Sequence, residues 1–187
     1  LSFGHGSASA YDEAAYLILH TLHLPLDTLD PFLDARLISD EKNALLALLK
    51  QRVDKRIPVA YLTQEAWLGD FRFYVDKRVI VPRSFIAELI QEQFASWIAD
   101  TKIVTNVLDL CTGSGCLAIL AAHAFPDAAV DSVDISPAAL EVAKRDIADY
   151  GMEDRIQIIE SDMFTNLKGK QYDVIISNPP YVDAPSM

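Results

Sequence analysis

The chain has 187 residues, of which 51% are hydrophobic and 23% are charged. This composition is typical of a globular protein with a buried core and excludes a disordered segment. No apolar run approaches the eighteen or so residues of a membrane span and no signal peptide opens the sequence, so we expect a cytoplasmic protein without a membrane partner. The 16 basic and 27 acidic residues give a formal net charge of −11. That charge disfavours binding to bare nucleic acid and favours a basic protein partner.

Residues 1–58 are predicted to form a small helical domain. Ser9 and Asp12 resemble a capping box at the start of a first helix. Ser39 is expected to cap a second helix, and a shorter helix is expected around residues 31–38. Both a packing role and recognition of a partner are open for this domain. The apolar stripes of the two long helices are expected to comprise Ala15, Ile18, Leu19 and Leu22, and Leu45, Leu48, Leu49, Arg52 and Val53.

Residues 59–100 are predicted to form a β-hairpin and a connecting helix. Apolar and polar side chains alternate over residues 71–75, residues 76–78 make a turn, and residues 79–81 give the returning strand. A helix is expected after Ser84. Its apolar face comprises Ile86, Leu89, Ile90, Phe94, Trp97 and Ile98.

Over residues 101–187, strand and helix patterns alternate, which predicts a parallel sheet with covering helices. In an open parallel sheet, ligands bind at the carboxyl ends of the strands. The loops that follow the strands are therefore expected to converge on one binding site. The expected strands are residues 104–110, 129–134, 155–160 and 172–177, and the expected helices are residues 116–124 and 137–150.

Three of these loops have the character of a nucleotide-like cofactor site. In Asp109–Gly115, glycines let the backbone pass close to a ligand, and the following helix presents free N–H groups. The loop differs from the dinucleotide fingerprint because the third glycine position is Ala118. Asp134 ends the second strand, where a carboxylate accepts hydrogen bonds from ribose hydroxyls, and capping of the next helix is its alternative role. Residues 161–163 follow the third strand, where a polar group and an apolar lid could hold an adenine ring.

The segment Asn178-Pro179-Pro180-Tyr181 follows the fourth strand and is predicted to be a rigid loop rich in hydrogen-bond acceptors. Neither proline has an N–H, and a residue before proline has an extended backbone. The Asn178 side-chain oxygen and the Pro179 carbonyl can accept from two N–H groups, and Tyr181 adds an aromatic face. We therefore expect a planar NH2 group as the guest, such as an amide or an exocyclic base amine.

Together these loops resemble the HemK-type family of S-adenosylmethionine-dependent methyltransferases, which methylate the side-chain amide nitrogen of a glutamine in a protein. The resemblance runs through most of the chain, including residues 65–67, 73–76 and 81–84. It implies a Rossmann-like class I methyltransferase sheet that lacks about three C-terminal strands, and S-adenosyl-L-methionine as the cofactor. The implied cofactor-binding residues are Asp109, Cys111, Thr112, Gly113, Ser114, Gly115, Asp134, Asp162, Met163 and Asn178. The implied catalytic residues are Asn178, Pro179 and Tyr181, and Pro180 is a further substrate-binding residue.

The segment Pro82–Ile90 resembles the ribosomal branch of this family, because the release-factor branch usually has Pro-Arg-Pro and then an Asp-Thr-Glu-like run. Cys111, where the release-factor branch more often has glycine, and Phe-Gly-His-Gly at residues 3–6 indicate the same branch. Phe85 departs from the branch, which more often has a small residue or proline there. Members of the ribosomal branch modify a glutamine of the large-subunit ribosomal protein uL3. The resemblance therefore implies a basic ribosomal protein as the substrate and no direct nucleic-acid substrate.

Three alternatives stay open. A release-factor glutamine methyltransferase or a nucleic-acid amino-methyltransferase would share these loops, because a base amine is also a planar NH2. The chain begins at Leu1 and ends six residues after Tyr181, so we expect a fragment of a longer protein that could be an inactive cofactor-binding piece.

No metal is expected, because His20 and His23 lack a further ligand cluster. The two cysteines, at positions 111 and 116, are expected to be reduced thiols.

Overall fold

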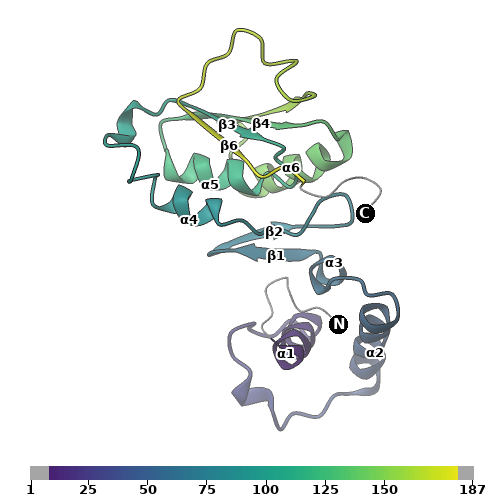
Figure 1. The fold of residues 1–187 in the computed structure, drawn as a ribbon. Helices are drawn as coiled ribbons and strands as arrows, with labels where there is room; N and C mark the ends of the chain where they lie inside the picture. The colour runs from purple at the N-terminus through teal and green to yellow at the C-terminus, as the bar shows by residue number, and fades with distance from the viewer. Residues whose placement is uncertain (1–8, 181–187) are drawn as a thin grey trace. The chain divides into compact units, whose positions relative to one another are not determined.

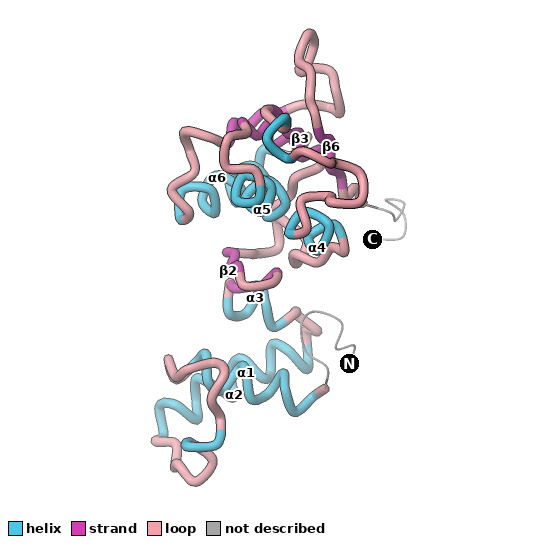
Figure 2. The backbone as a smooth tube through the Cα atoms, turned by 90° about the vertical axis from the view of Figure 1, so that its left-hand side faces the viewer, coloured by secondary structure: helices cyan, strands magenta, loops and turns pink. Residues whose placement is uncertain are grey.

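The computed structural model of this chain describes residues 9–180. The chain divides into two compact units, Leu1–Trp67 and Leu68–Met187, and each is described by itself. Figure 1 labels their helices and strands, and Figure 2 shows the same backbone turned by 90°. The expected division of the chain at residues 58 and 100 concerns the roles of its segments and stays a prediction.

The first unit is helical, as predicted. It contains α1 (Ala10–Thr21), the 3₁₀ helix η1 (Asp30–Phe32), α2 (Ser39–Asp54) and α3 (Val59–Thr63). The Ser9 hydroxyl caps α1 by accepting a hydrogen bond from the Asp12 N–H. The expected cap of α2 is wrong by one residue, because Ser39 is already helical and the Glu41 carboxylate accepts from the Ile38 N–H. The helix expected over residues 31–38 is reduced to η1.

The core of this unit joins α1 to α2 and α3. Buried Glu13 and Arg52 form an ion pair between the two long helices, hydrogen bonded through two guanidinium nitrogens. The expected apolar stripe of α2 is partly wrong: Leu49 and Val53 are exposed, because the helix buries the side that carries Leu45 and Arg52. Among the described residues of the unit, the buried apolar ones are Leu17, Leu19, Leu45, Ala60 and Ala66.

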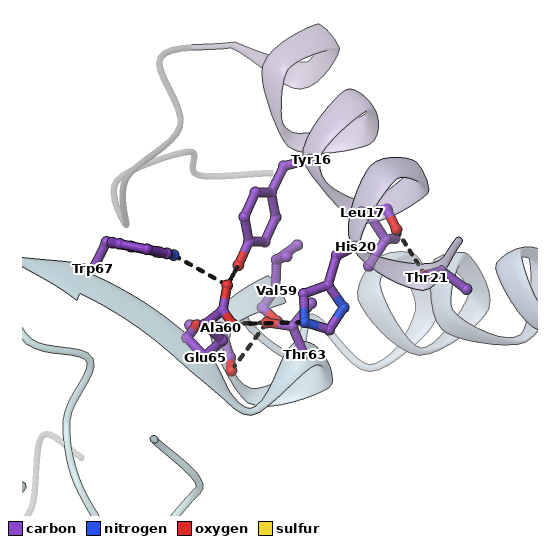
Figure 3. A network of polar contacts seen from close by, with 9 residues as sticks. All are labelled: Tyr16, Leu17, His20, Thr21, Val59, Ala60, Thr63, Glu65 and Trp67. Atoms are coloured by element: carbon purple, nitrogen blue, oxygen red, sulfur yellow. Dashed lines mark hydrogen bonds and ion pairs between the residues drawn. The ribbon is translucent and has the colours of Figure 1, made fainter. Parts of the chain in front are cut away.

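A polar network within the first unit centres on the Glu65 carboxylate (Figure 3). The Tyr16 hydroxyl and the Trp67 indole N–H both donate to Glu65 Oε1, at 2.8 and 3.0 Å. His20 Nε2 lies 4.0 Å from Glu65 Oε2. Burial and the hydrogen bond to Glu65 raise the pKa of the Tyr16 hydroxyl above its usual range. These contacts fix α1 to the segment that follows α3.

The strands β1 (Glu65–Leu68) and β2 (Phe71–Tyr74) form a two-stranded sheet. The predicted hairpin is therefore wrong in its second strand, because β2 pairs with the strand before it and residues 79–81 are not a strand. Gly69 has a φ of +60°, which suits the short turn between β1 and β2. The predicted turn at Asp76 does form: its carboxylate accepts from the Arg78 N–H and guanidinium, which lowers the pKa of Asp76 to about 2.

Helix α4 spans Ile86–Gln91 and is shorter than predicted. Gln93 and Phe94 both have a φ of +52°, and a left-handed backbone cannot continue an α-helix. Trp97, expected on the apolar face, is 71% exposed, because it lies in the turns beyond the helix end.

The second unit contains a parallel four-stranded sheet of order β5-β4-β3-β6, in agreement with the predicted fold class. Its helices lie on one face of the sheet in both views, where α4, α5 and α6 share one core with the strands. The opposite face carries Leu108 and Val133, which pack under Leu167 of the loop between β5 and β6. The elements are η2 (Thr101–Ile103), β3 (Asn106–Leu110), α5 (Cys116–Ala124), β4 (Ala129–Asp134), α6 (Pro137–Asp149), β5 (Ile156–Glu160) and β6 (Val174–Ser177).

Candidate active site

The carboxyl ends of the four parallel strands lie along one edge of the sheet. Leu110 at the end of β3 pairs with Val133 of β4 and with Ser177 of β6, and Asp134 pairs with Glu160 of β5. The loops that follow are therefore neighbours, as predicted. They carry Cys111 to Gly115 after β3, Asp134 at the end of β4, Asp162 and Met163 after β5, and Asn178 to Pro180 after β6.

The loop after β3 has a left-handed backbone at three positions. Cys111, Gly113 and Gly115 have φ values of +63°, +59° and +79°. A Cβ at Gly115 would lie 3.1 Å from the Cβ of Ala143 in α6, so a glycine is needed where α5 starts beside α6. A Cβ at Gly113 would meet nothing within 4 Å among the described residues. The loop is thus packed against α6 at Gly115, whereas there is open space beside it at Gly113.

Hydrogen bonds inside the sheet hold this loop from below. The Thr112 hydroxyl donates to Asp109 Oδ2, which also accepts from the Ala118 N–H at 3.0 Å. The Ser132 hydroxyl of β4 donates to the Thr112 oxygen at 2.9 Å. Asp109 is buried, its Oδ1 has no hydrogen-bond partner among the described residues, and burial raises its pKa to about 7. Asp109 and Thr112 therefore support the loop, whereas sequence reasoning grouped them with its ligand-facing residues and did not find Ser132.

Asp134 joins the loop to the start of α6. Its Oδ2 accepts from the Gly113 N–H and its Oδ1 from the Ser136 N–H, each at 2.9 Å. The alternative role as helix cap is taken by Ser136, whose hydroxyl accepts from the Ala139 N–H. An ionised carboxylate has about four acceptor positions, so two N–H donors leave capacity for ligand hydroxyls.

Exposed apolar side chains flank the acidic residues at this edge. Ile135 follows Asp134 directly, and Met163 and Phe164 follow Asp162, and all three apolar residues are largely exposed. Sequence reasoning found Met163 but missed Ile135 and Phe164. The signal that was missed is an apolar residue directly after an acidic residue near the end of a strand. Such a pair suits a ligand in which a flat apolar ring is joined to polar groups.

Asn178 is held against a distant segment of the second unit. Its side-chain Nδ2 donates to the backbone carbonyl of Arg83 at 3.5 Å, which sequence reasoning did not foresee. The Ser177 hydroxyl donates to the Leu110 carbonyl at 2.8 Å and fixes the end of β6 to the end of β3. Pro179 and Pro180 are exposed. Tyr181 and residues 3–6 lie outside the described residues.

The cysteine at the site is a neutral thiol. Burial and the nearby Asp134 carboxylate raise the pKa of Cys111 above its usual value, and burial raises the pKa of Cys116 to about 12. Nucleophilic chemistry by either thiol is therefore disfavoured.

Over residues 9–180, no cluster of three or more His, Cys, Asp or Glu side chains is arranged to hold a metal ion. Within the same range no helix has the length and apolar character needed to cross a bilayer.

The residues at this edge fit S-adenosylmethionine. The open space at Gly113 and the start of α5 suit the anionic end of an amino acid, because a helix N-terminus favours negative charge. Asp134 suits ribose hydroxyls, and the exposed Ile135 and Met163 suit the faces of an adenine ring. Together these groups have the chemical character that a nucleoside needs at the edge of a Rossmann-like sheet.

Comparison with known proteins agrees with this class. Residues 90–186 match the methyltransferase small domain family. The chain is 59% identical over 187 residues to the ribosomal protein uL3 glutamine methyltransferase of Neisseria gonorrhoeae, covering 100% of this chain and 62% of the relative. It is 57% identical over 194 residues to the protein of the same name from Burkholderia pseudomallei, covering 100% of this chain and 63% of the relative. A solved SAM-dependent methyltransferase from Agrobacterium tumefaciens has a TM-score of 0.48 at 23% identity, covering 62% of this chain and 39% of that structure.

The chain belongs to the methyltransferase small domain family. The residues at the edge of the sheet fit S-adenosylmethionine as the methyl donor of such a domain. The chain spans a little over three fifths of the length of the curated relatives it matches.

Proposed function

We propose that the protein methylates the side-chain amide nitrogen of a glutamine in ribosomal protein uL3. The observation that carries this proposal is the identity of 57% to 59% over the whole chain to proteins named for that reaction. The site supports it, because a cofactor edge and an acceptor-rich loop meet at neighbouring strand ends. A substrate in the ribosome is consistent with a cytoplasmic protein.

The chemical difficulty lies in the nucleophile, because an amide nitrogen shares its lone pair with the carbonyl group. When bound, S-adenosylmethionine supplies a sulfonium methyl group that is already electrophilic. Asn178 and Pro179 accept hydrogen bonds from the two amide N–H groups, which orients the nitrogen and stabilises the positive charge that develops on it. Tyr181 confines the amide. The methylated nitrogen becomes acidic and loses a proton to water, so the reaction needs no strong base.

The contact between Asn178 Nδ2 and the Arg83 carbonyl supports this role for Asn178. A carbonyl oxygen can only accept, so it selects the side-chain orientation in which the amide nitrogen faces Arg83. In that orientation the other polar atom of the Asn178 side chain is an oxygen acceptor. An oxygen acceptor is what an NH2 guest requires.

Residues 1–58 are proposed to recognise the substrate protein, and residues 101–187 to carry the first part of the catalytic domain. The ribosomal protein is proposed to be basic, which would complement the net charge of −11. Release factors and nucleic acids are alternative substrates, because the cofactor loop and the loop that begins at Asn178 would serve for methylation of either.

We predict that Asn178→Ala lowers methyl transfer by at least about a hundredfold, because a preorganised acceptor at the reacting atom is lost. The affinity for S-adenosylmethionine should change by less than about threefold. The measurement is transfer of a labelled methyl group from the cofactor to purified uL3, with mass spectrometry of the modified residue and calorimetric titration of the cofactor.

The control is Asn106→Ala at the start of β3, the end of the strand opposite the site, where an exposed asparagine side chain donates to the Thr105 hydroxyl oxygen. It should keep most of the activity. Normal turnover by Asn178→Ala would contradict the mechanism. Label transferred to a release factor, RNA or DNA in preference to uL3 would contradict the proposed substrate.

A further inference from the structure

Phe85 is the most exposed of the large hydrophobic residues that the structure describes, at 86%. It lies directly before α4, at a position where the ribosomal branch that this segment resembles more often has a small residue or proline. A single exposed apolar residue is common on protein surfaces and needs no explanation by itself. Two further observations distinguish Phe85.

The first observation is that the backbone under Phe85 is anchored on both sides. Val81 before it and Ala87 after it are buried. The Ser84 hydroxyl accepts from the Ile86 N–H at 3.2 Å, and the Ser84 carbonyl accepts from the Ala87 N–H at 3.2 Å. Phe85 is thus displayed from an ordered turn, and an aromatic side chain with two rotatable bonds loses little entropy when it binds.

The second observation is that this turn touches the acceptor loop. Arg83, two residues before Phe85, receives the hydrogen bond from Asn178 Nδ2 at 3.5 Å through its backbone carbonyl. The Arg83 side chain is exposed and has no hydrogen bond or ion pair within residues 9–180. A protein segment whose glutamine amide reaches Asn178 must therefore pass beside the turn of Arg83 and Phe85.

We propose that Phe85 is a specificity-determining residue, which packs against an apolar side chain next to the methylated glutamine in the protein substrate. The inference rests on the proposed function, since it assumes a glutamine at Asn178. Phe85 acts on binding of the polypeptide around the glutamine, whereas Asn178 acts on the amide itself. Phe85 therefore affects the choice of substrate and leaves the reacting atoms unchanged.

The test compares Phe85→Ala and Phe85→Leu with the wild type, in the intact protein with purified uL3 as the substrate. Loss of the buried aromatic contact should raise the KM for uL3 about tenfold in Phe85→Ala, with kcat within about twofold and an unchanged affinity for S-adenosylmethionine. Phe85→Leu should restore most of the loss, because leucine keeps an apolar side chain. Thermal melting should be unchanged in both variants, since the side chain is exposed.

Trp97→Ala is the matched control, because Trp97 is a 71% exposed aromatic residue of the same unit in a different segment. It should leave the KM for uL3 unchanged. A second readout uses peptides with the uL3 glutamine flanked either by its native neighbours or by glycines. Phe85→Ala should weaken binding of the peptide with the native neighbours and leave binding of the glycine-flanked peptide unchanged.

A KM within twofold of the wild type for Phe85→Ala, or equal losses with both peptides, would overturn the inference and leave the proposed function intact. Wild-type protein that transfers no methyl group to uL3 would instead overturn the proposed function, and this inference with it.

Discussion

At the residue scale, the site depends on backbone conformations that few side chains adopt. Gly115 combines a φ of +79° with close contact to Ala143, and so it faces both a conformational and a steric restriction. Gly151 has a φ of +62° but open space around the position of a Cβ. Cys111 has a φ of +63°, although a positive φ is uncommon for residues other than glycine. The two glycines therefore allow the conformational and steric contributions to be separated.

We predict that Gly151→Ala costs about 1 kcal/mol of the free energy of unfolding, because only the left-handed backbone is penalised. Gly115→Ala should cost about 2 kcal/mol or more and also lower the affinity for S-adenosylmethionine, because α5 must shift away from α6. Chemical denaturation and cofactor titration of both variants check this. Equal stability losses in the two variants would show that the contact with Ala143 carries no cost.

At the element scale, a buried carboxylate joins β2 to α6. Asp146 Oδ1 accepts from the Tyr74 N–H at 2.7 Å, while its Oδ2 has no hydrogen-bond partner in the described part of the chain. The Tyr150 hydroxyl bridges the N–H and carbonyl of Arg72, each at 2.9 Å. Arg145 covers the Tyr74 ring at 3.6 Å from its centroid. Burial raises the pKa of Asp146 to about 7, so ionisation of this side chain opposes the docked arrangement.

The raised pKa of Asp146 gives a pH-dependent stability of known sign. The pKa of Asp146 is higher in the folded protein than in the unfolded chain. The stability that the protonated side chain contributes is therefore fully present below about pH 4, and it is lost as the pH rises through about 7. We predict that the stability of Asp146→Asn relative to the wild type rises by about 1 kcal/mol or more between pH 5 and pH 8. Urea unfolding at both pH values measures it.

The control for that prediction is Asp127→Asn, an exposed acidic residue of the same unit that is not among the groups that shift the pKa of Asp146. Its stability relative to the wild type should stay nearly constant across the same range. A flat difference between Asp146→Asn and the wild type would mean that Asp146 ionises normally in the folded protein.

At the scale of the whole molecule, charge is the property that bears on partner choice. The net charge of −11 attracts a basic protein over distances longer than any single contact. Dissolved salt screens such attraction, with a Debye length of about 10 Å at 0.1 M and about 3 Å at 1 M. The proposed reaction with a basic ribosomal protein should therefore depend on ionic strength.

We predict that raising sodium chloride from about 0.05 M to about 0.5 M raises the KM for uL3 at least about threefold through a slower association rate. The KM for S-adenosylmethionine should change much less, because its binding depends on short contacts at the strand ends. Steady-state kinetics with each substrate varied in turn gives both values. A KM for uL3 that is independent of salt would contradict electrostatic steering.

The sequence by itself determined the order of the strands and α-helices over residues 101–180 and the edge of the sheet where their loops meet. This was possible because strand and helix periods differ and because parallel strands carry their carboxyl ends to one side. It misplaced the returning strand of the hairpin, because β2 pairs with β1, and it misplaced the end of α4, because Gln93 and Phe94 adopt a left-handed backbone.

Only the tertiary structure decided which side chains support the loops. The Thr112–Ser132, Tyr74–Asp146 and Asn178–Arg83 contacts join residues 20, 72 and 95 positions apart, and no local pattern encodes such distances. The same holds for the exposure of Phe85 beside the acceptor loop. A periodic pattern reports which residues share a face of one element, but the contacts between elements depend on how the completed sheet and helices pack together.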